Sequence, residues 1–567
     1  MFIKITRSGP RQYLQLVEAY RDDTGKAKHR TLATLGRLDQ IAGNLDSVLA
    51  GLLKVSGRSP DLLNPAVPSI EFESARALGD VWALNALWES LGFSELRRVF
   101  KKTRHTTDVE ALIRVMVFNR LCDPDSKLGV LRWLETISFP GVETAAITHQ
   151  QLLRSMDALI DHQVAVDNVV AGLLRPLIDQ DLSVVFYDLT TIRAEGLSSV
   201  EDDIRKFGMA KEGLIARQFM LGVVQTSDGL PIYHEVFAGN TAESPTLLPT
   251  LQTVLSRYPT IRRVILVADR GLLSLDNLEA LSGIKLQSGE PLEFVLAVPG
   301  RRYSEFVDLL TPFHAAHCQA TTEEVIDELA WQDLRLVVAH DPETAQDMRV
   351  ARQAKMAVLE AQAAAWAGKL DAQDEGVKAR GKKLSDSGAK ARLYHAVKEA
   401  HLAHILRVDL NSELFAYTID EDALALAQLM DGKLLLVTNA PDLSPREVVE
   451  RYKSLADIER GFRVLKSEIE IGPVFHRLPE RIRAHASICF MALILYRVMR
   501  QRLTAAQTGL SPERALDQLR RIQHHQIRLA QEEKPITGIS KLADIHNQVF
   551  AALNLKKPDQ PQQLALL

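Results

Sequence analysis

The amino-acid sequence predicts an α/β fold, in which a mixed sheet with helices is interrupted by an insertion and accompanied by a small N-terminal β-rich domain and a helical domain. Three observations predict it. The chain has 567 residues, several times the size of a typical domain. Its 46% hydrophobic and 25% charged residues are typical of a soluble globular protein. The spacing of apolar residues changes from helical to strand-like near residue 183 and then alternates up to residue 300.

Composition narrows the class of protein further. No segment reaches the roughly 18 uncharged apolar residues that a membrane span needs, and residues 486–496 (ASICFMALILY) predict a buried helix instead. The N-terminal residues lack the apolar segment of a secretory signal. The scattered Cys122, Cys318 and Cys489 match neither a disulfide framework nor a zinc-binding spacing. We therefore expect a cytoplasmic protein.

The N-terminal segment, residues 1–58, predicts a small domain that contains a β-hairpin. Near-alternating strands flank the turn residues DDTGK, and a Pro-bearing stretch at 56–69 is typical of a linker. The segment holds ten Lys and Arg against five acids, whereas the whole chain has a net charge of −4. DNA binding is therefore one candidate role, and an ordinary solvated face is the other.

Residues 70–180 predict a helical domain, which is a second candidate for DNA binding. Apolar residues recur there at three- and four-residue spacing, and we expect Trp82, Trp88 and Trp133 to pack in its core. Three strands, expected to be antiparallel, begin at residue 183, and alternating helices and strands follow to residue 300. The same sheet resumes with the strand pattern KLLLVTN at 433–439.

These patterns predict the remaining domain boundaries. We expect a catalytic domain formed by residues 181–300 and 432–505. An insertion, residues 301–431, contains a strand pair around Trp331 and a long Ala/Lys/Glu-rich helical stretch. Residues 506–567 form a C-terminal helical region.

Two acids end buried strands, which is unusual because burying a charge is costly. Asp188 follows the apolar run SVVFY, and Asp269 follows VILVA. Sites in open α/β sheets lie where strands end, so two such acids predict that their carboxylates converge.

A third acid lies on a helix predicted to begin at Ser444. Ser444, Pro445 and Glu447 have the spelling of a capping box. On one continuous helix, residues seven apart fall within about 40° of one another. That spacing puts Tyr452, Glu459 and Lys466 on one face, together with Arg463. A solvated face with ion pairs between helix turns is the alternative interpretation.

Three converging carboxylates can hold two divalent ions about 4 Å apart, which is the arrangement for in-line phosphoryl displacement. Mg²⁺ prefers such oxygen ligands. Like charges gathered at strand ends raise one another's pKa, and a bound cation reverses that penalty.

The motifs resemble those of bacterial insertion-sequence transposases of the DDE type, and the resemblance spans nearly the whole chain. They are FYDLTT with Asp188, GNTAESPTLLPTL, LVADRGLLS with Asp269, and the late helix. The helix signature of a large subgroup, Y-x-x-R-x-x-x-E-x-x-x-x-x-x-K, reads YKSLADIERGFRVLK here, with Leu455 in place of the Arg. The arginine's DNA contact then falls to Arg460 or Arg463.

The resemblance implies a ribonuclease-H-like catalytic domain and a transposase that cleaves and transfers DNA strands at the ends of an insertion sequence. It implies catalysis and metal binding by Asp188, Asp269 and Glu459, with two Mg²⁺ ions or Mn²⁺ as a substitute. Its DNA-binding residues would be Tyr452, Arg460, Arg463 and Lys466. The partners would be double-stranded DNA, at element ends and target, and a second copy of the chain in a homodimer or higher assembly. The protein would be associated with the bacterial nucleoid.

Other interpretations remain. A catalytically silent relative would bind DNA ends without cutting them, and a nuclease of the same fold would only hydrolyse DNA. The DLTT motif lacks the second acid of aspartyl-phosphate hydrolases, because Thr190 stands in its place. His476 and His485 lack a zinc spacing, so phosphate contact or ordinary surface is the better interpretation. In the insertion, Trp331 and Trp366 are expected to pack, with base stacking as the alternative.

Overall fold

The computed structural model describes residues 1–58, 70–101, 107–179, 182–196, 202–209, 215–269, 275–318, 322–376, 383–529 and 535–559. It divides into two compact units. One contains Met1–Ala75 and His524–Ile539, and the other contains Arg76–Gln523 and Ser540–Gln560.

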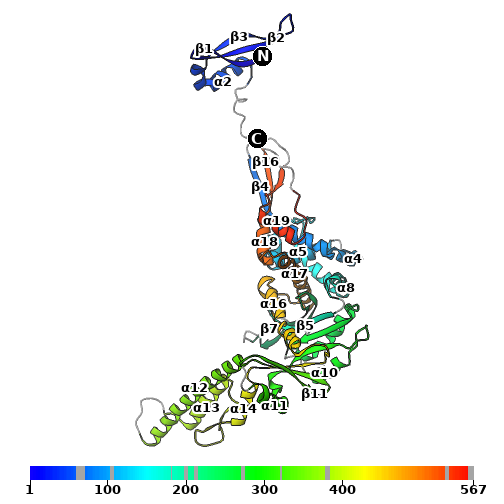
Figure 1. The fold of residues 1–567 in the computed structure, drawn as a ribbon, viewed down its shortest axis with the longest axis vertical. Coiled ribbons are helices and arrows are strands. Elements are labelled where there is room, and N and C mark those ends of the chain that lie inside the picture. The colour runs from blue at the N-terminus through cyan, green and yellow to red at the C-terminus, as the bar shows by residue number, and fades with distance from the viewer. Residues whose placement is uncertain are drawn as a thin grey trace. The chain divides into compact units, whose positions relative to one another are not determined.

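The first unit contains two small three-stranded sheets (Figure 1). One sheet is formed by β1 (Phe2–Ser8), β2 (Arg11–Arg21) and β3 (Ala27–Arg37), which α1 (Leu38–Ile41) and α2 (Leu45–Val55) follow. The predicted hairpin is confirmed, because β2 pairs with β3 around a turn in which the Asp22 carboxylate accepts from the Thr24 and Lys26 backbone N–H groups. The other sheet contains β4 (Ile70–Ala77), β16 (Gln523–Leu529) and β17 (Ile536–Ile539). Of the predicted linker, residues 59–69 lie outside the described part of the chain.

Most of the segment predicted as a helical domain, residues 70–180, forms helices of the second unit, whereas Ile70–Ala77 is the strand β4. These helices are α3 (Gly79–Leu91), α4 (Leu96–Phe100), α5 (Val109–Cys122), α6 (Lys127–Thr136), α7 (His149–Asp161) and α8 (Gln163–Leu174). Trp88 and Trp133 lie in the core and Trp82 packs against it. The core continues through α17 (Pro479–Ala505), to which α18 (Pro512–Arg520) and α19 (Asp544–Ala552) are packed. Among the described residues α17 is the one helix long and apolar enough to span a membrane, and 94% of that stretch is buried inside the protein, as predicted for 486–496.

A nine-stranded mixed sheet forms the centre of the second unit. Its order is β11-β12-β15-β10-β9-β5-β7-β6, with β8 also paired to β7. The expected pairings are confirmed: β5, β7 and β8 are antiparallel, whereas β9 is parallel to β5 and β10 is parallel to β9. The strands are β5 (Leu182–Arg193), β6 (Lys206–Met209), β7 (Ile215–Thr226), β8 (Pro231–Ala238), β9 (Arg263–Ala268), β10 (Glu293–Ala297), β11 (Val325–Trp331), β12 (Leu334–His340) and β15 (Lys433–Thr438).

The segment expected as an insertion contributes to this sheet. After α11 (Val307–His317), the hairpin β11–β12 extends the sheet through antiparallel pairing of β12 with β15. The rest forms a smaller body with its own core, built from α12 (Pro342–Asp374), α13 (Asp386–Glu399), β13 (Leu406–Val408), β14 (Tyr417–Ile419) and α14 (Glu421–Met430). Trp366 packs against that core, and Trp331 contacts Phe306 with ring centroids 5.1 Å apart. Both tryptophans therefore pack, as expected.

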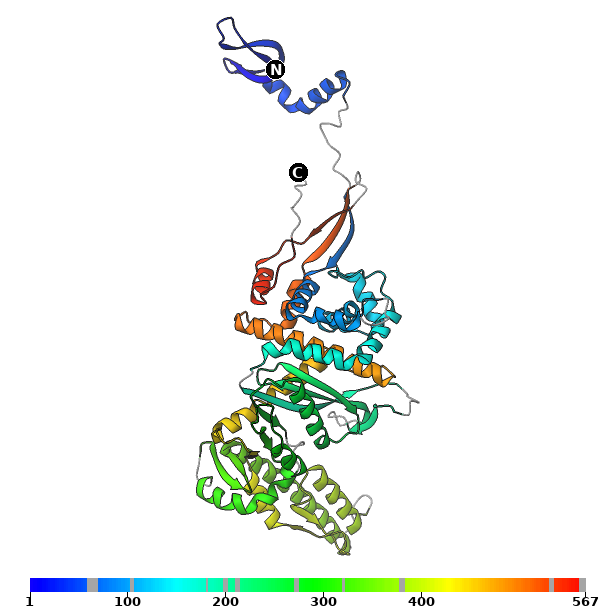
Figure 2. The ribbon, with the colours of Figure 1, turned by 90° about the vertical axis from the view of Figure 1, so that its right-hand side faces the viewer.

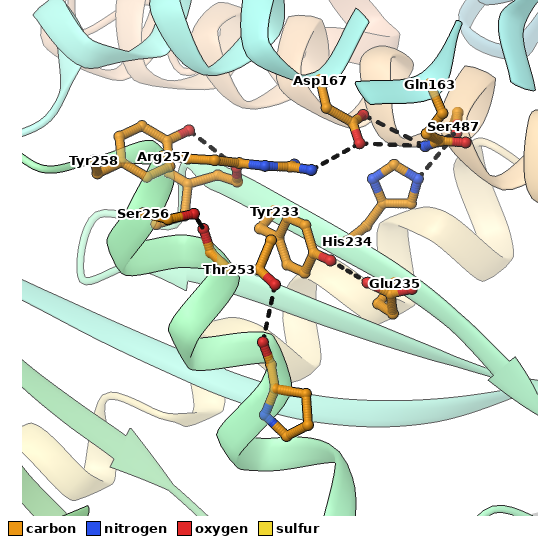
Figure 3. Close-up of polar contacts among 12 residues, drawn as sticks. Gln163, Asp167, Tyr233, His234, Glu235, Thr253, Ser256, Arg257, Tyr258 and Ser487 are labelled. Carbon is orange, nitrogen blue, oxygen red and sulfur yellow. Dashed lines mark hydrogen bonds and ion pairs between the residues drawn. The ribbon is translucent and has the colours of Figure 1, made fainter. Parts of the chain in front are cut away.

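Helices pack on the sheet (Figure 2), and partly buried polar contacts attach them to it (Figure 3). Arg257, at the end of α9 (Leu247–Arg257), forms an ion pair of 2.9 Å with Asp167 of α8 and lies over the Tyr233 ring. His234 of β8 contacts the Ser487 hydroxyl of α17 at 3.1 Å. Burial lowers the pKa of His234 to about 4, so this imidazole is neutral and contributes to packing.

Candidate active site

The two strand-end acids lie at the same edge of the sheet. β5 and β9 are parallel, and the last paired residues are Tyr187 and Ala268. Asp188 and Asp269 each come one residue later. Because adjacent strands lie about 4.8 Å apart, the two acids are neighbours across the strand pair.

Both acids also face the same side of the sheet. The Tyr187 hydroxyl donates to Thr246 Oγ1 at 2.7 Å, so Tyr187 faces the segment that leads into α9. Successive side chains of a strand point to opposite faces, so Asp188 points away from α9. On that opposite side the Tyr452 hydroxyl donates to Asp269 Oδ1 at 2.8 Å.

The late helical segment differs from the single helix that the sequence predicts. It consists of α15 (Pro445–Lys453), a turn at 454–455, α16 (Ala456–Arg463) and a π-helical turn, η8 (Val464–Glu468). The capping box at Ser444 and Glu447 is confirmed. Tyr452, Glu459 and Lys466 lie on three different elements, so the prediction of one continuous helix is wrong, and whether the three side chains share a face stays a prediction.

Glu459 is exposed on α16, which packs against β5. Two residues later, Gly461 lies so close to the sheet that an added Cβ would stand 2.4 Å from Gln225 Nε2. Gln225 of β7 pairs with Phe186 of β5, and Phe186 shares its face with Asp188. The helix that carries Glu459 therefore covers the same face of the sheet as the two aspartates.

The cations expected to contact DNA lie on or directly after this helix. Arg460 and Arg463 belong to α16 and Lys466 to η8, and all three side chains are exposed. Tyr452 differs from them, because it is half-buried and its hydroxyl is directed at Asp269. The helix motif could not predict that Tyr452 bonds to Asp269, because the two residues are 183 positions apart in the sequence.

The donor set at this site fits a hard divalent cation. Asp188 and Asp269 offer carboxylate oxygens from adjacent strands, and the Asp188 carboxylate accepts from the Leu189 backbone N–H at 2.7 Å. Oxygen ligands of this kind suit Mg²⁺ or Mn²⁺. The phenol of Tyr452 leaves one oxygen of Asp269 for a ligand.

A second group of potential metal ligands lies between α11 and β12. His314, Cys318 and His340 place one ligand atom each within 4.8 Å of one another. Lys433 Nζ donates to His314 Nδ1 at 3.0 Å, so a cation already faces the cluster. Burial and Lys433 together lower the pKa of His340 to about 4. Like-charge repulsion at that position disfavours a second cation.

His476 and His485 do come together, with ring centroids 5.8 Å apart. His485 Nε2 contacts the Ile471 carbonyl at 2.9 Å, and burial followed by Lys127 and Arg120 holds its pKa well below the usual range. Both rings line a cavity that also contains Lys127.

Comparisons with known proteins give two family matches. The model of the N-terminal domain of IS1634 family transposases matches residues 3–64, and the model of the transposase DDE domain matches residues 179–495, more than half of the chain. A cryo-EM structure described as the piggyBac transposase synaptic complex with hairpin DNA is similar at 8% identity and a TM-score of 0.36, covering 78% of each chain. None of the curated proteins compared with the chain matches it.

Proposed function

The chain belongs to the insertion-sequence transposases of the DDE type, and from this premise we propose that it cuts and joins DNA strands by metal-dependent phosphoryl transfer at the ends of its own element. The catalytic and metal-binding residues in this proposal are Asp188, Asp269 and Glu459. The catalytic domain is proposed to be ribonuclease-H-like.

The observation that carries the proposal is the parallel register of β5 and β9. It makes Asp188 and Asp269 neighbours at one edge of the sheet, on the face that α16 covers. Glu459 is exposed on α16, the helix that contacts β5, and we propose that its carboxylate completes the site with the two aspartates. All three proposed metal ligands are carboxylates, and Mg²⁺ prefers such oxygen ligands.

Two bound Mg²⁺ ions would neutralise charge at the scissile phosphate and activate the attacking oxygen. The protein's own residues do the positioning. The sheet fixes the two aspartates, and the Tyr452 hydroxyl orients Asp269. Arg460, Arg463 and Lys466 are proposed to grip phosphates beside the cut, because contacts with phosphates position DNA without reading its sequence.

The partners in this proposal are double-stranded DNA, both element ends and target. We propose that two or more copies of the chain work together, because two ends must be brought to one target. The cellular location would be the bacterial cytoplasm, in association with the nucleoid.

The experiment uses duplexes that carry the borders of the element encoding this chain, incubated with the full chain and Mg²⁺. Wild type should cleave and join strands. Asp188→Asn, Asp269→Asn and Glu459→Gln should each lower the cleavage rate by orders of magnitude while end binding persists. Glu450→Gln is a matched control, since Glu450 is an exposed acid on the neighbouring α15.

The outcomes separate the alternatives. Binding without cleavage by wild type would indicate a silent DNA-end-binding relative. Cleavage without joining would indicate a hydrolytic nuclease. Full activity in any one of the three acid variants would show that this acid is wrongly assigned.

A further inference from the structure

A cavity of about 740 Å³ lies between the helical domain and the segment that follows η8. Its walls come from α5 and α6, from the start of α7, and from residues 470–485. Among the ionisable side chains of the lining, basic residues outnumber acids. The cations and histidines are Arg120, Lys127, Arg477, Arg481, His149, His476 and His485, and the acids are Asp125 and Glu470.

Lys127 is the unusual residue in this cavity. It is 6% exposed, and no described residue forms a hydrogen bond or ion pair with its ammonium group. A buried charge without a partner is costly, often by several kcal/mol. Burial, followed by repulsion from Arg120, lowers the pKa of Lys127 to about 7. An anionic ligand in the cavity would therefore supply the negative charge that Lys127 lacks.

The two acids of the lining, Asp125 and Glu470, do not pair with Lys127. The Asp125 carboxylate accepts from the Ser126 N–H at 2.6 Å and pairs with Arg132 at 3.2 Å. Glu470 is exposed, and its backbone carbonyl accepts from Arg120.

The partners of the other cations do not neutralise the positive charge at Lys127. Arg481 has its own partner, Asp157, at 2.8 Å. The buried Arg120 donates to uncharged oxygens of Asn119, Asp125 and Glu470.

The cavity is linked to the active site by β5. Residue Val474 of the cavity wall accepts from the Glu195 N–H and donates to the Arg193 carbonyl, at 2.9 and 3.0 Å. Ala194 and Val474 form a parallel bridge. Asp188 is six residues upstream of Ala194 on the same extended segment, or about 20 Å at 3.3 Å per residue. That length corresponds to about six phosphates of one DNA strand at 3.4 Å each.

We propose that this cavity binds a backbone phosphate of the DNA, several nucleotides from the cut, with Lys127 as its main charged contact. The inference rests on the proposed function, because it takes DNA as the ligand. A phosphate oxygen would give Lys127 the charge-assisted hydrogen bond that it lacks in the free chain. The N-terminus of α6, which Ser126 caps, lies at the same cavity wall. Helix N-termini favour anions such as phosphate.

The test is a scan of single methylphosphonate linkages, which remove one phosphate charge at a time. Binding of border duplexes is measured without Mg²⁺ for wild type, Lys127→Met, Lys127→Gln and Lys101→Met. Lys101 is an exposed lysine of the helical domain outside the cavity and serves as the control. In wild type and Lys101→Met, one or two adjacent neutral linkages should weaken binding about tenfold.

In both Lys127 variants, unmodified DNA should bind about tenfold more weakly, and the same neutral linkages should have no further effect. Retained sensitivity to them in these variants would overturn the proposal. A structural role for Lys127 predicts lower thermal stability in Lys127→Met, whereas replacing an unpaired buried charge by an apolar side chain should leave stability unchanged or raise it.

A second arm uses inorganic phosphate and tests whether the ligand is a free anion. Phosphate at matched ionic strength should raise the melting temperature of wild type and not that of Lys127→Met. If it does so while no DNA linkage depends on Lys127, the cavity binds a free anion and the DNA assignment is wrong. Wild-type chain that shows the linkage pattern yet never cuts DNA with Mg²⁺ would refute the proposed function while leaving the cavity assignment intact.

Discussion

The hydrogen bond from Tyr452 to Asp269 makes Tyr452→Phe the most informative single change. The substitution removes one oxygen atom and keeps the ring, so packing of α15 is preserved. What is lost is a 2.8 Å contact between a hydroxyl and a carboxylate in a half-buried position. If the hydroxyl orients Asp269 for metal binding, the consequence should appear in the dependence of cleavage on Mg²⁺.

The expected size follows from the strength of such bonds. A hydrogen bond to a charged group contributes roughly 1.5–3 kcal/mol, and the partial exposure of Tyr452 favours the lower end. At 1.36 kcal/mol per factor of ten, 1.5 kcal/mol corresponds to about a tenfold change. Groups that orient metal ligands typically alter metal affinity by 10- to 100-fold, which agrees.

The assay is the initial rate of strand cleavage at a series of Mg²⁺ concentrations, with DNA binding measured separately. Tyr452→Phe should need about tenfold more Mg²⁺ for half-maximal rate and should recover most of its activity at saturating Mg²⁺. Tyr394→Phe, on α13, is the control and should behave as wild type. The competing hypothesis, from the resemblance to other transposases, is that Tyr452 contacts DNA. Weaker DNA binding with an unchanged Mg²⁺ dependence would support that hypothesis and refute ours.

Three further predictions follow from other residues. Lys466→Ala should weaken end binding and flatten its salt dependence by about one phosphate contact without changing sequence preference, and an unchanged slope at several salt concentrations would indicate a merely solvated side chain. Asp203→Ala leaves the fully buried Arg205 without the carboxylate that holds it at 3.0 Å, so chemical denaturation should show a loss of about 3–5 kcal/mol, whereas a loss below about 1 kcal/mol would contradict this account. The pKa of Lys127 falls from 10.5 in the unfolded chain to about 7, so the unfolded state binds more protons between these values and stability rises with pH across that window. Wild type should therefore lose stability relative to Lys127→Met as the pH is lowered from about 10 to about 7, and parallel melting curves across that range would refute the shift.

The parts of the site that the sequence predicts are those with a local signal. The alternation of apolar residues marks β5 and β9, so the strand-end positions of Asp188 and Asp269 follow from the amino-acid order alone. Ser444 and Glu447 mark the start of α15 because a capping box is a local pattern.

Other features depend on contacts between distant segments and have no such signal. The break after Lys453 contains neither glycine nor proline, so helical periodicity continues through it in the sequence. The pairing of β12 with β15 joins residues that are 93 (433 − 340) to 103 (438 − 335) positions apart. The cavity around Lys127 is likewise assembled from three separate stretches of chain.

The chain between β12 and β15 leaves the sheet and returns to it at adjacent residues. His340 and Lys433 face each other across β12 and β15, and the Asp341 N–H donates to the Gly432 carbonyl at 2.9 Å. The backbone therefore leaves the sheet and returns to it at neighbouring points. The elements from α12 to α14 form a separate body with its own hydrophobic core. We therefore expect that changes in the length or content of this segment, down to its replacement by a short turn, would leave the register of β5 and β9 unchanged.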